Sequence, residues 1–408
     1  MTTIEWRYRG GEELQGSETE PRHPGWLPLV SVLETDEAIF RDCLFMPGFD
    51  ISSNIYLLAG EDLVIVDPGN DYTAYMELFD TRYSPEAVKK VVLTHGHRDH
   101  SMGVFELLRA YPGIQKRGGF ELVMHEAGPP ELKEVPRQFG CLVTEVRGGE
   151  TLRLGQAEWE VVYTPGHTID GICLVHAPSK TAFTGDMVQP HLMAEPDKNA
   201  GGDLRHYLYG IKKLLKKDIE NILPGHGSPV AAIGRRIVEE TYIGLLLRII
   251  GTESPIPWMD GALALLKRGL PEETVFCLDK ELARRPANSK ALHVKALCLN
   301  ELGRFEEAIE ALDELEKLES REEEVFSILA RGYALMGLGS YEASVGVFDR
   351  VLREDPKMHD ALVYKGMALY LSGRREEAME ITPFRNEFVV RFKEEMARSR
   401  RAPGSGGG

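Results

Sequence analysis

Seven residues of the types that bind transition metals follow one another along the chain, each in a short motif that contains glycine. They are His95, His97, Asp99, His100, His167, Asp186 and His226. Five imidazoles and two carboxylates are enough to hold two metal ions that share one bridging ligand and a water molecule. The set therefore predicts a two-metal centre of the kind that hydrolases use.

The first four candidates come directly after an apolar run, residues 91–93, that predicts a buried strand. His95 and His97 are two residues apart, so in an extended backbone both imidazoles project to the same side and one cation can take both. Asp99 and His100 open a segment with helical spacing. We therefore expect them at the N-terminus of a helix, where they can reach a second metal.

The three later candidates also follow short apolar, strand-like runs and lie beside glycine. These runs are residues 161–163 before His167, residues 182–183 before Asp186, and residues 222–223 before His226. Glycine allows the backbone to turn tightly, so ligands from distant loops can converge at one rim.

Together these motifs resemble those of the metallo-β-lactamase-fold hydrolase superfamily, over residues 28–250, with glyoxalase II as one similar member. The runs 53–58 and 63–69 resemble the opening hairpin of the family, and Asp67 resembles an aspartate that holds a ligand or loop in place. The resemblance implies an α/β fold, an αββα sandwich of two mixed sheets with helices outside. Hydrophobic periodicity alone predicts only alternating strands and helices.

The resemblance also implies a role for each of the seven residues. His95, His97 and His167 would hold the first metal, Asp99, His100 and His226 the second, and Asp186 would bridge the two. Asp99 would in addition orient the attacking water and accept its proton. The nitrogen- and oxygen-rich set favours two divalent transition-metal ions, zinc above all, with iron or manganese as alternatives.

Three functions are compatible with this site. The first is hydrolysis of a small carbonyl substrate, namely a thioester, ester or lactone. The second is a phosphodiesterase or ribonuclease resembling ribonuclease Z; the acidic net charge of −16 and the absence of a long basic insertion oppose it. The third is a non-enzymatic adaptor, which the cost of burying unpaired histidines and carboxylates opposes. An iron-dependent persulfide dioxygenase would need only His95, His167 and Asp186.

Other polar residues near these motifs have simpler interpretations. We expect His125 to be structural, because the seven candidates already fill two metal sites. His191 and His206 follow the proposed bridging aspartate; each is interpreted as a solvated loop residue, with contact to substrate as the alternative. Arg98 is interpreted as a surface residue.

Composition limits the class of protein. With 408 residues, 43% apolar and 27% charged, the chain is expected to form two globular domains. No apolar stretch approaches the ~20 residues of a membrane span, and no signal-peptide pattern is present. Five scattered cysteines without a CxxC pair favour a reducing compartment. We therefore expect a cytoplasmic protein that binds neither membranes nor nucleic acid.

The second half of the chain contains an internal repeat. Four glycines, 34, 36 and 34 residues apart, lie between pairs of amphipathic segments: Gly269, Gly303, Gly339 and Gly373. Five residues after each comes a small residue: Thr274, Ala308, Ser344 and Ala378. The pattern resembles the tetratricopeptide repeat, a helix–turn–helix of about 34 residues. A helical bundle without repeat geometry is the alternative. The resemblance implies a protein partner or self-association.

The predicted organisation has four parts. Residues 1–251 form the catalytic domain and residues 252–257, with two prolines, form the linker. An all-α repeat domain covers residues 258–382. Residues 383–408 are predicted as a C-terminal helix followed by a flexible tail.

Overall fold

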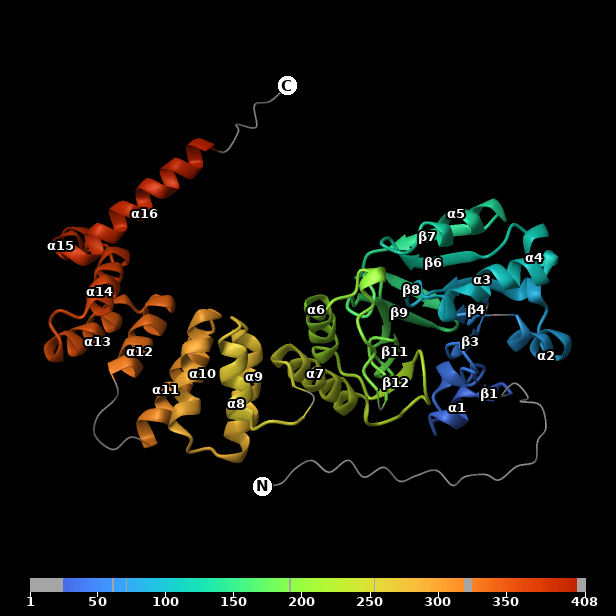
Figure 1. Cartoon of the computed structure of the whole chain (residues 1–408), viewed down its shortest axis with the longest axis horizontal. Helices are drawn as coiled ribbons and strands as arrows, with labels where there is room; N and C mark the ends of the chain where they lie inside the picture. Colours follow the sequence, from blue (N-terminus) through green and yellow to red (C-terminus); the bar gives the residue numbers. More distant parts are fainter. Residues whose placement is uncertain are drawn as a thin grey trace. The chain divides into compact units, whose positions relative to one another are not determined.

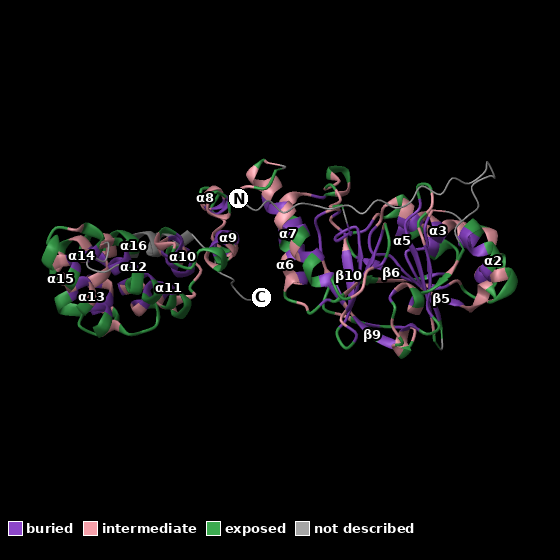
Figure 2. Cartoon of the chain, turned by 90° about the horizontal axis from the view of Figure 1, so that it is seen from below, coloured by how far each residue is buried: buried purple, intermediate pink, exposed green. Residues whose placement is uncertain are grey.

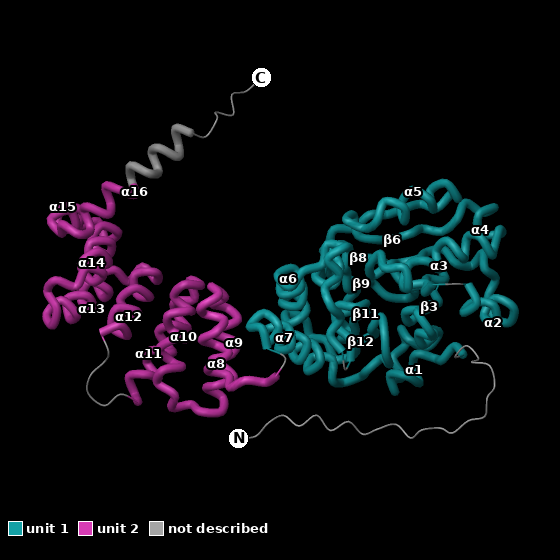
Figure 3. Tube along the Cα trace, viewed as in Figure 1, with its two compact units in different colours: residues 1–253 teal, residues 254–408 magenta. Residues whose placement is uncertain are grey.

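The computed structural model describes residues 25–60, 62–70, 72–190, 192–252, 254–318 and 325–401. The predicted tail, residues 402–408, lies outside the described residues, as do the N-terminal residues and His191. The chain divides into two compact units, residues 1–253 and 254–408 (Figure 3).

The first unit contains two mixed β-sheets (Figure 1). The larger sheet has seven strands in sequence order: β1 (Leu27–Pro28), β2 (Leu44–Met46), β3 (Ile55–Ala59), β4 (Leu63–Val66), β5 (Val88–Val92), β6 (Glu121–His125) and β7 (Leu142–Val146). Strands β1–β4 pair antiparallel, and β4–β7 pair parallel. The predicted opening hairpin is confirmed as β3 and β4.

The smaller sheet has five strands in the order β12 (Asn221–Pro224), β11 (Thr181–Gly185), β10 (Ile172–His176), β9 (Ala157–Tyr163) and β8 (Thr151–Leu154). Only β11 and β12 pair parallel; the other pairs are antiparallel. Each of the apolar runs expected before a metal ligand lies within or at the end of a strand of one of the two sheets.

Alternation of side chains along β4 shows how the layers pack. Val64 and Val66 join a core with Trp159 and Phe183 of the other sheet. Leu63 and Ile65 instead join the core under the outer helices. Successive side chains of a strand point to opposite faces, so a strand covered on both faces is apolar throughout.

Helices cover the outer faces of the two sheets. Figure 2 shows the strands, which are mostly buried, between these helices. The larger sheet packs on α2 (Thr73–Thr81), α3 (Arg98–Ala110), α4 (Pro112–Lys116) and α5 (Glu131–Gln138). Helices α6 (Leu204–Leu215) and α7 (Gly234–Ile250) lie on the side of the smaller sheet (Figure 2). A short helix, α1 (Leu29–Val32), follows β1. The αββα sandwich is confirmed.

All the regular secondary structure in the described part of the second unit is helical. Its helices are α8 (Trp258–Leu266), α9 (Pro271–Arg284), α10 (Ser289–Glu301), α11 (Phe305–Leu318), α12 (Val325–Gly337), α13 (Tyr341–Glu354), α14 (His359–Leu371), α15 (Arg375–Glu380) and α16 (Thr382–Arg401). The four predicted turn glycines have φ between 69° and 92°, the left-handed conformation that glycine adopts without a steric cost.

The small residues expected at the helix contacts are all fully buried. Ser344 also donates from Oγ to the carbonyl of Gly332 on the paired helix, at 2.7 Å. A Cβ at Gly332 would come within 2.5 Å of the Phe348 ring, so both helices must carry small residues to approach this closely. Among the described helices, none is long and apolar enough to cross a membrane.

Truncation of the chain after Gly251 tests whether the first unit folds alone. The two cores that pack its β-sheets draw on residues 26–231, and the cores that pack α9 to α16 draw on residue 282 onward. We expect residues 1–251 to unfold cooperatively, with a melting temperature within about 4 °C of the matching transition in the full chain, because the shortened chain keeps both cores that pack its sheets. Circular dichroism during heating measures this; a non-cooperative transition would contradict it.

Candidate metal centre

The seven candidate residues converge where strands of both sheets end. His95 lies in the loop after β5, and His97 caps α3, whose first turn carries Asp99 and His100. The other three come from the smaller sheet. His167 lies between β9 and β10, Asp186 follows β11 directly, and His226 follows β12.

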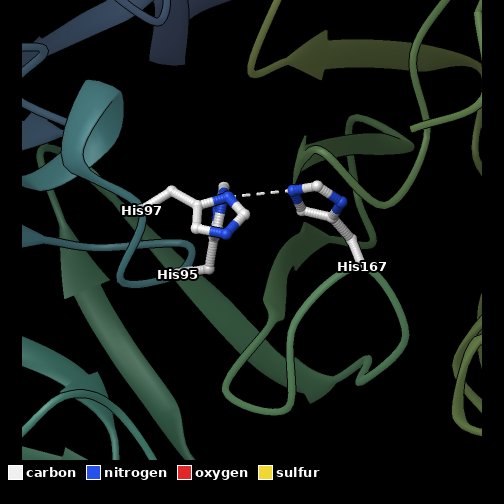
Figure 4. Close-up of side chains that lie close together, drawn as sticks. All are labelled: His95, His97 and His167. Atoms are coloured by element: carbon white, nitrogen blue, oxygen red, sulfur yellow. Dashed lines mark hydrogen bonds between the residues drawn. The ribbon is translucent and has the colours of Figure 1, made fainter. Parts of the chain in front are cut away.

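A first group consists of His95, His97 and His167 (Figure 4). Nδ1 of His97 lies 3.1 Å from Nε2 of His95 and 3.0 Å from Nε2 of His167. Three ring nitrogens from two loops therefore point at one another. Repulsion of their lone pairs would oppose this arrangement unless a proton or a cation lay among them.

A second group consists of Asp99, His100 and His226. Oδ2 of Asp99 lies 3.0 Å from Nε2 of His226 and 3.6 Å from Nε2 of His100. Asp99 and His226 are half-buried, whereas His100 is fully buried. The group is thus open to solvent on the side of Asp99 and His226.

Asp186 contacts both groups through different oxygens. Its Oδ2 lies 3.5 Å from Nε2 of His167 in the first group. Its Oδ1 lies 3.4 Å from Nε2 of His100 and 3.6 Å from Nε2 of His226 in the second. Because one carboxylate faces two nitrogen clusters, the seven residues form a single continuous centre.

Two buried atoms of this centre have no hydrogen-bond partner among the described residues: Nε2 of His100 and Oδ1 of Asp186. Leaving such atoms unpaired is costly in a folded protein. The two atoms face each other at 3.4 Å, and His, Asp and Glu are among the ligands that divalent transition metals prefer. The residues present therefore fit metal ions.

Electrostatics supports the same conclusion. Burial, reinforced by neighbouring His100, lowers the pKa of His95 well below its usual value, so its ring is neutral and keeps a lone pair. Burial also opposes the charged form of His100, but the carboxylates of Asp67 and Asp186 outweigh it and raise its pKa well above the usual range. The centre thus attracts a positive charge at this point, which a metal ion can supply.

Asp67 holds the larger sheet's side of the centre in place. Its Oδ2 accepts from Nδ1 of His100 at 2.8 Å, which leaves Nε2 facing Asp186. The same carboxylate accepts from the backbone N–H and the hydroxyl of Thr94, both at 2.7 Å. One buried carboxylate therefore orients a candidate ligand and the loop that carries two others.

Several contacts around the centre could not be predicted from the sequence. Asp197 accepts from Nε2 of His97 at 3.0 Å, although 100 residues separate them. Nδ1 of His167 contacts the carbonyl oxygen of Glu195 at 2.6 Å. Asn54 donates from Nδ2 to the carbonyls of Pro224 and Gly227, and so holds the loop of His226. Only the folded chain brings these segments together.

Two of the other histidines considered in the sequence, His125 and His206, lie apart from both groups. His125 ends β6, stacks on Tyr163 with ring centroids 4.1 Å apart, and accepts from the N–H of Ala127. His206 is exposed, as expected, but it lies in the first turn of α6 and not in a loop, and it pairs with Asp203 at 2.6 Å. His191 lies outside the described residues, so its predicted place in a solvated loop stays a prediction.

A family model described as the metallo-beta-lactamase superfamily matches residues 48–226, and a tetratricopeptide-repeat model matches residues 259–321 and 329–381. An uncharacterized protein of Mycobacterium leprae is 32% identical over 198 residues, 45% of this chain and 89% of that protein. The chain belongs to the metallo-beta-lactamase superfamily. The predicted family and the predicted repeats are thereby confirmed.

Other similar proteins match the chain at lower sequence identity. An atrochrysone carboxyl ACP thioesterase of Aspergillus aculeatus is 27% identical over 195 residues, 46% of this chain and 54% of that protein. The chain thus spans about half the length of the thioesterases it matches. Among solved structures, a metallo-beta-lactamase family protein from Thermus thermophilus is 21% identical, with a TM-score of 0.38 over 60% of this chain and 93% of that one.

Substitution of Gly225, in the loop after β12, tests how tightly the centre is packed. A Cβ there would lie 2.4 Å from Oδ1 of Asp186 and 2.6 Å from Cε1 of His100. Gly225→Ala is expected to displace one of these side chains and to weaken zinc binding by roughly 10-fold or more, in line with the cost of overpacking. Competition with a chromogenic chelator measures the affinity.

Gly346→Ala, in α13, is the matched control, since no atom lies within 4 Å of its added Cβ. It should leave zinc affinity unchanged and stabilise its helix by up to about 1 kcal/mol. Equal zinc affinities for the two variants would contradict the close packing at Gly225.

Proposed function

We propose that this chain is a hydrolase that uses two divalent metal ions, with zinc as the first choice, to cleave a small carbonyl substrate. Thioesters come first among the candidate substrates, followed by esters and lactones. The observation that carries the proposal is the position of Asp186, whose two oxygens face different groups of candidate ligands within one continuous centre. A single-metal site would need only one of these groups.

The proposed ligand sets follow the two groups. His95, His97 and His167 would hold one metal, Asp99, His100 and His226 the other, and Asp186 would bridge them. When bound, such ions lower the pKa of a water molecule to near neutrality and polarise the bond that it attacks. The protein contributes by fixing the ligands in place and by keeping the inner part of the centre dry.

In this proposal Asp99 would handle the proton. It lies in the first turn of α3, is half-buried, and contacts His226 on the solvent side of the centre. Its carboxylate would orient the attacking water and accept the proton that the water gives up. The opposite, buried side of the centre offers Asp186, whose oxygens already face three histidines.

Two observations favour a small carbonyl substrate over nucleic acid. Relatives that match the first unit include proteins named as ACP thioesterases. Nucleic acid requires cationic side chains along its backbone, but the sequence from Gln189 to Gly202, after the bridging residue, contains Lys198 as its one Lys or Arg. Leu192 in this segment is exposed, which suits an apolar acyl group better than a phosphate.

The second unit would bind a protein or a second copy of this chain. Its tetratricopeptide repeats are of a kind that presents stacked helices as an extended binding surface. Among the described residues, every group of candidate metal ligands lies in the first unit. The repeats would therefore serve assembly and leave the chemistry to the metal centre.

The metal stoichiometry tests the two-metal proposal. Elemental analysis of the natively purified protein is expected to approach two metals per chain. Asp186→Ala should lose metal and activity together, because it removes a contact from each group. The control Asp218→Ala removes an exposed carboxylate of the same unit, one paired with Lys180, and should keep both metals. A wild-type value that stays at one under metal-replete conditions would contradict the proposal.

A substrate panel tests the reaction class. Turnover of acyl thioesters and lactones is compared with that of bis(p-nitrophenyl) phosphate and structured RNA. We expect thioesters to be preferred, and Asp99→Asn to lower their kcat by about 10²- to 10⁴-fold, the usual contribution of a general base. Phosphodiester turnover that exceeds thioester turnover by orders of magnitude, and that Asp99→Asn abolishes, would show that the protein is a phosphodiesterase.

A further inference from the structure

The loop between β11 and α6 contacts two of the candidate ligands, His97 and His167, from outside the centre. It begins with Asp186 and ends at Asp203, which caps α6. Midway along it, the carbonyl of Glu195 contacts Nδ1 of His167 at 2.6 Å. The backbone N–H of Asp197 donates to the carbonyl of His167 at 2.7 Å. The segment is thus attached to the histidine loop at two points.

The side chain of Asp197 makes a third attachment. Its Oδ2 lies 3.0 Å from Nε2 of His97, and its Oδ1 accepts from the N–H of Asn199 at 2.8 Å. The backbone carbonyl of Asp197 accepts from the N–H groups of Ala200 and Gly202, at 3.1 and 2.7 Å. The carboxylate is therefore held in one orientation by a tight turn before it meets the imidazole.

This contact decides which nitrogen of His97 is available to a metal. A carboxylate can only accept, so a neutral His97 must carry its proton on Nε2. Its Nδ1 then presents a lone pair toward His95 and His167, which lie about 3 Å away. Fixing the tautomer and the ring angle of a ligating histidine is the known effect of a carboxylate on its outer nitrogen.

The second group has the same arrangement. There, Asp67 accepts from the outer nitrogen of His100, and Nε2 of that ring faces the centre. Each group of candidate ligands therefore contains one histidine oriented by a carboxylate. Asp67 comes from the larger sheet, whereas Asp197 comes from the loop that follows the smaller one.

We propose that Asp197 is a positioning residue that orients His97 and thereby sets the affinity of the site formed by His95, His97 and His167. The inference rests on the metal centre of the proposed function. It concerns one of the two metals only, because the Asp197 side chain reaches the centre through His97, which belongs to the group with His95 and His167. The side chains of Asp197 and His97 are 34% and 25% exposed, so water competes for the contact. We therefore expect an effect near the lower end of the usual 10- to 100-fold range.

The test compares the same change, aspartate to asparagine, at two positions of this loop. Asp197→Asn keeps an oxygen for the N–H of Asn199 but loses the charge that faces His97. Asp203→Asn is the control, because it keeps the cap of α6 and its side chain faces His206 instead. Both full-length variants are stripped of metal and titrated with zinc against a chromogenic chelator. Cobalt(II) titration, followed by visible absorption, then reports on each binding step separately.

Asp197→Asn is expected to weaken one of the two zinc-binding steps by about 10-fold and to leave the other, and the melting temperature of the metal-free protein, unchanged. Asp203→Asn should match the wild type in both steps. If Asp197→Asn does not fold, Asp197→Ser replaces it, since serine also caps a turn but is too short to reach His97.

Equal zinc affinities for Asp197→Asn and Asp203→Asn would overturn the inference. So would an equal loss in both binding steps together with a lower melting temperature, because that result would indicate a structural role for the loop. The two proposals can fail separately. If the wild-type protein hydrolyses no substrate of the panel but Asp197→Asn still weakens one zinc-binding step, the inference is supported and the proposed function fails.

Discussion

The close approach of buried His100 and Asp186 is the constraint on which the rest of the first unit depends. Each has an atom without a hydrogen-bond partner among the described residues, and these atoms face each other at 3.4 Å. An arrangement of this kind is stable only where positive and negative charges balance. Two sheets that end at the same edge, with helices covering their outer faces, supply the burial, and the surrounding carboxylates supply the charge.

The loops around the centre reduce the freedom of its side chains. Asp67 fixes the ring of His100 and the backbone of Thr94 together. Asn54 holds the loop that carries His226, and the absence of a side chain at Gly225 lets Asp186 and His100 approach. Side chains that are held by their neighbours lose little entropy when a ligand arrives, so such a site binds more tightly than a flexible one.

The second unit is built on a different principle. Each helix pair turns at a glycine with positive φ and closes on a small buried residue, so that stability comes from contacts between neighbouring repeats. Arg331 on α12, for example, pairs with Asp313 and Glu316 of the preceding helix, α11. Repeats of this kind depend little on distant parts of the chain, which suits a unit added to a catalytic one.

The sequence alone determined the features that depend on local spacing. The seven ligand-type residues, the strand runs that precede them, and the glycine period of the repeats all lie within short segments whose periodicity reflects backbone geometry. The resemblance of the short run 63–69 to the family also implied the role of Asp67. These features were enough to name the superfamily and both parts of the fold.

Only the tertiary structure decided which distant residues meet. The sequence places Asp197 in a loop with no distinguishing pattern, and 100 residues separate it from His97. The stacking of His125 on Tyr163 likewise depends on how the sheets are packed. Contacts of this kind leave no periodic pattern in the sequence, because the residues that meet belong to different segments of the chain. They exist only once burial of the apolar strands has fixed the edges of both sheets.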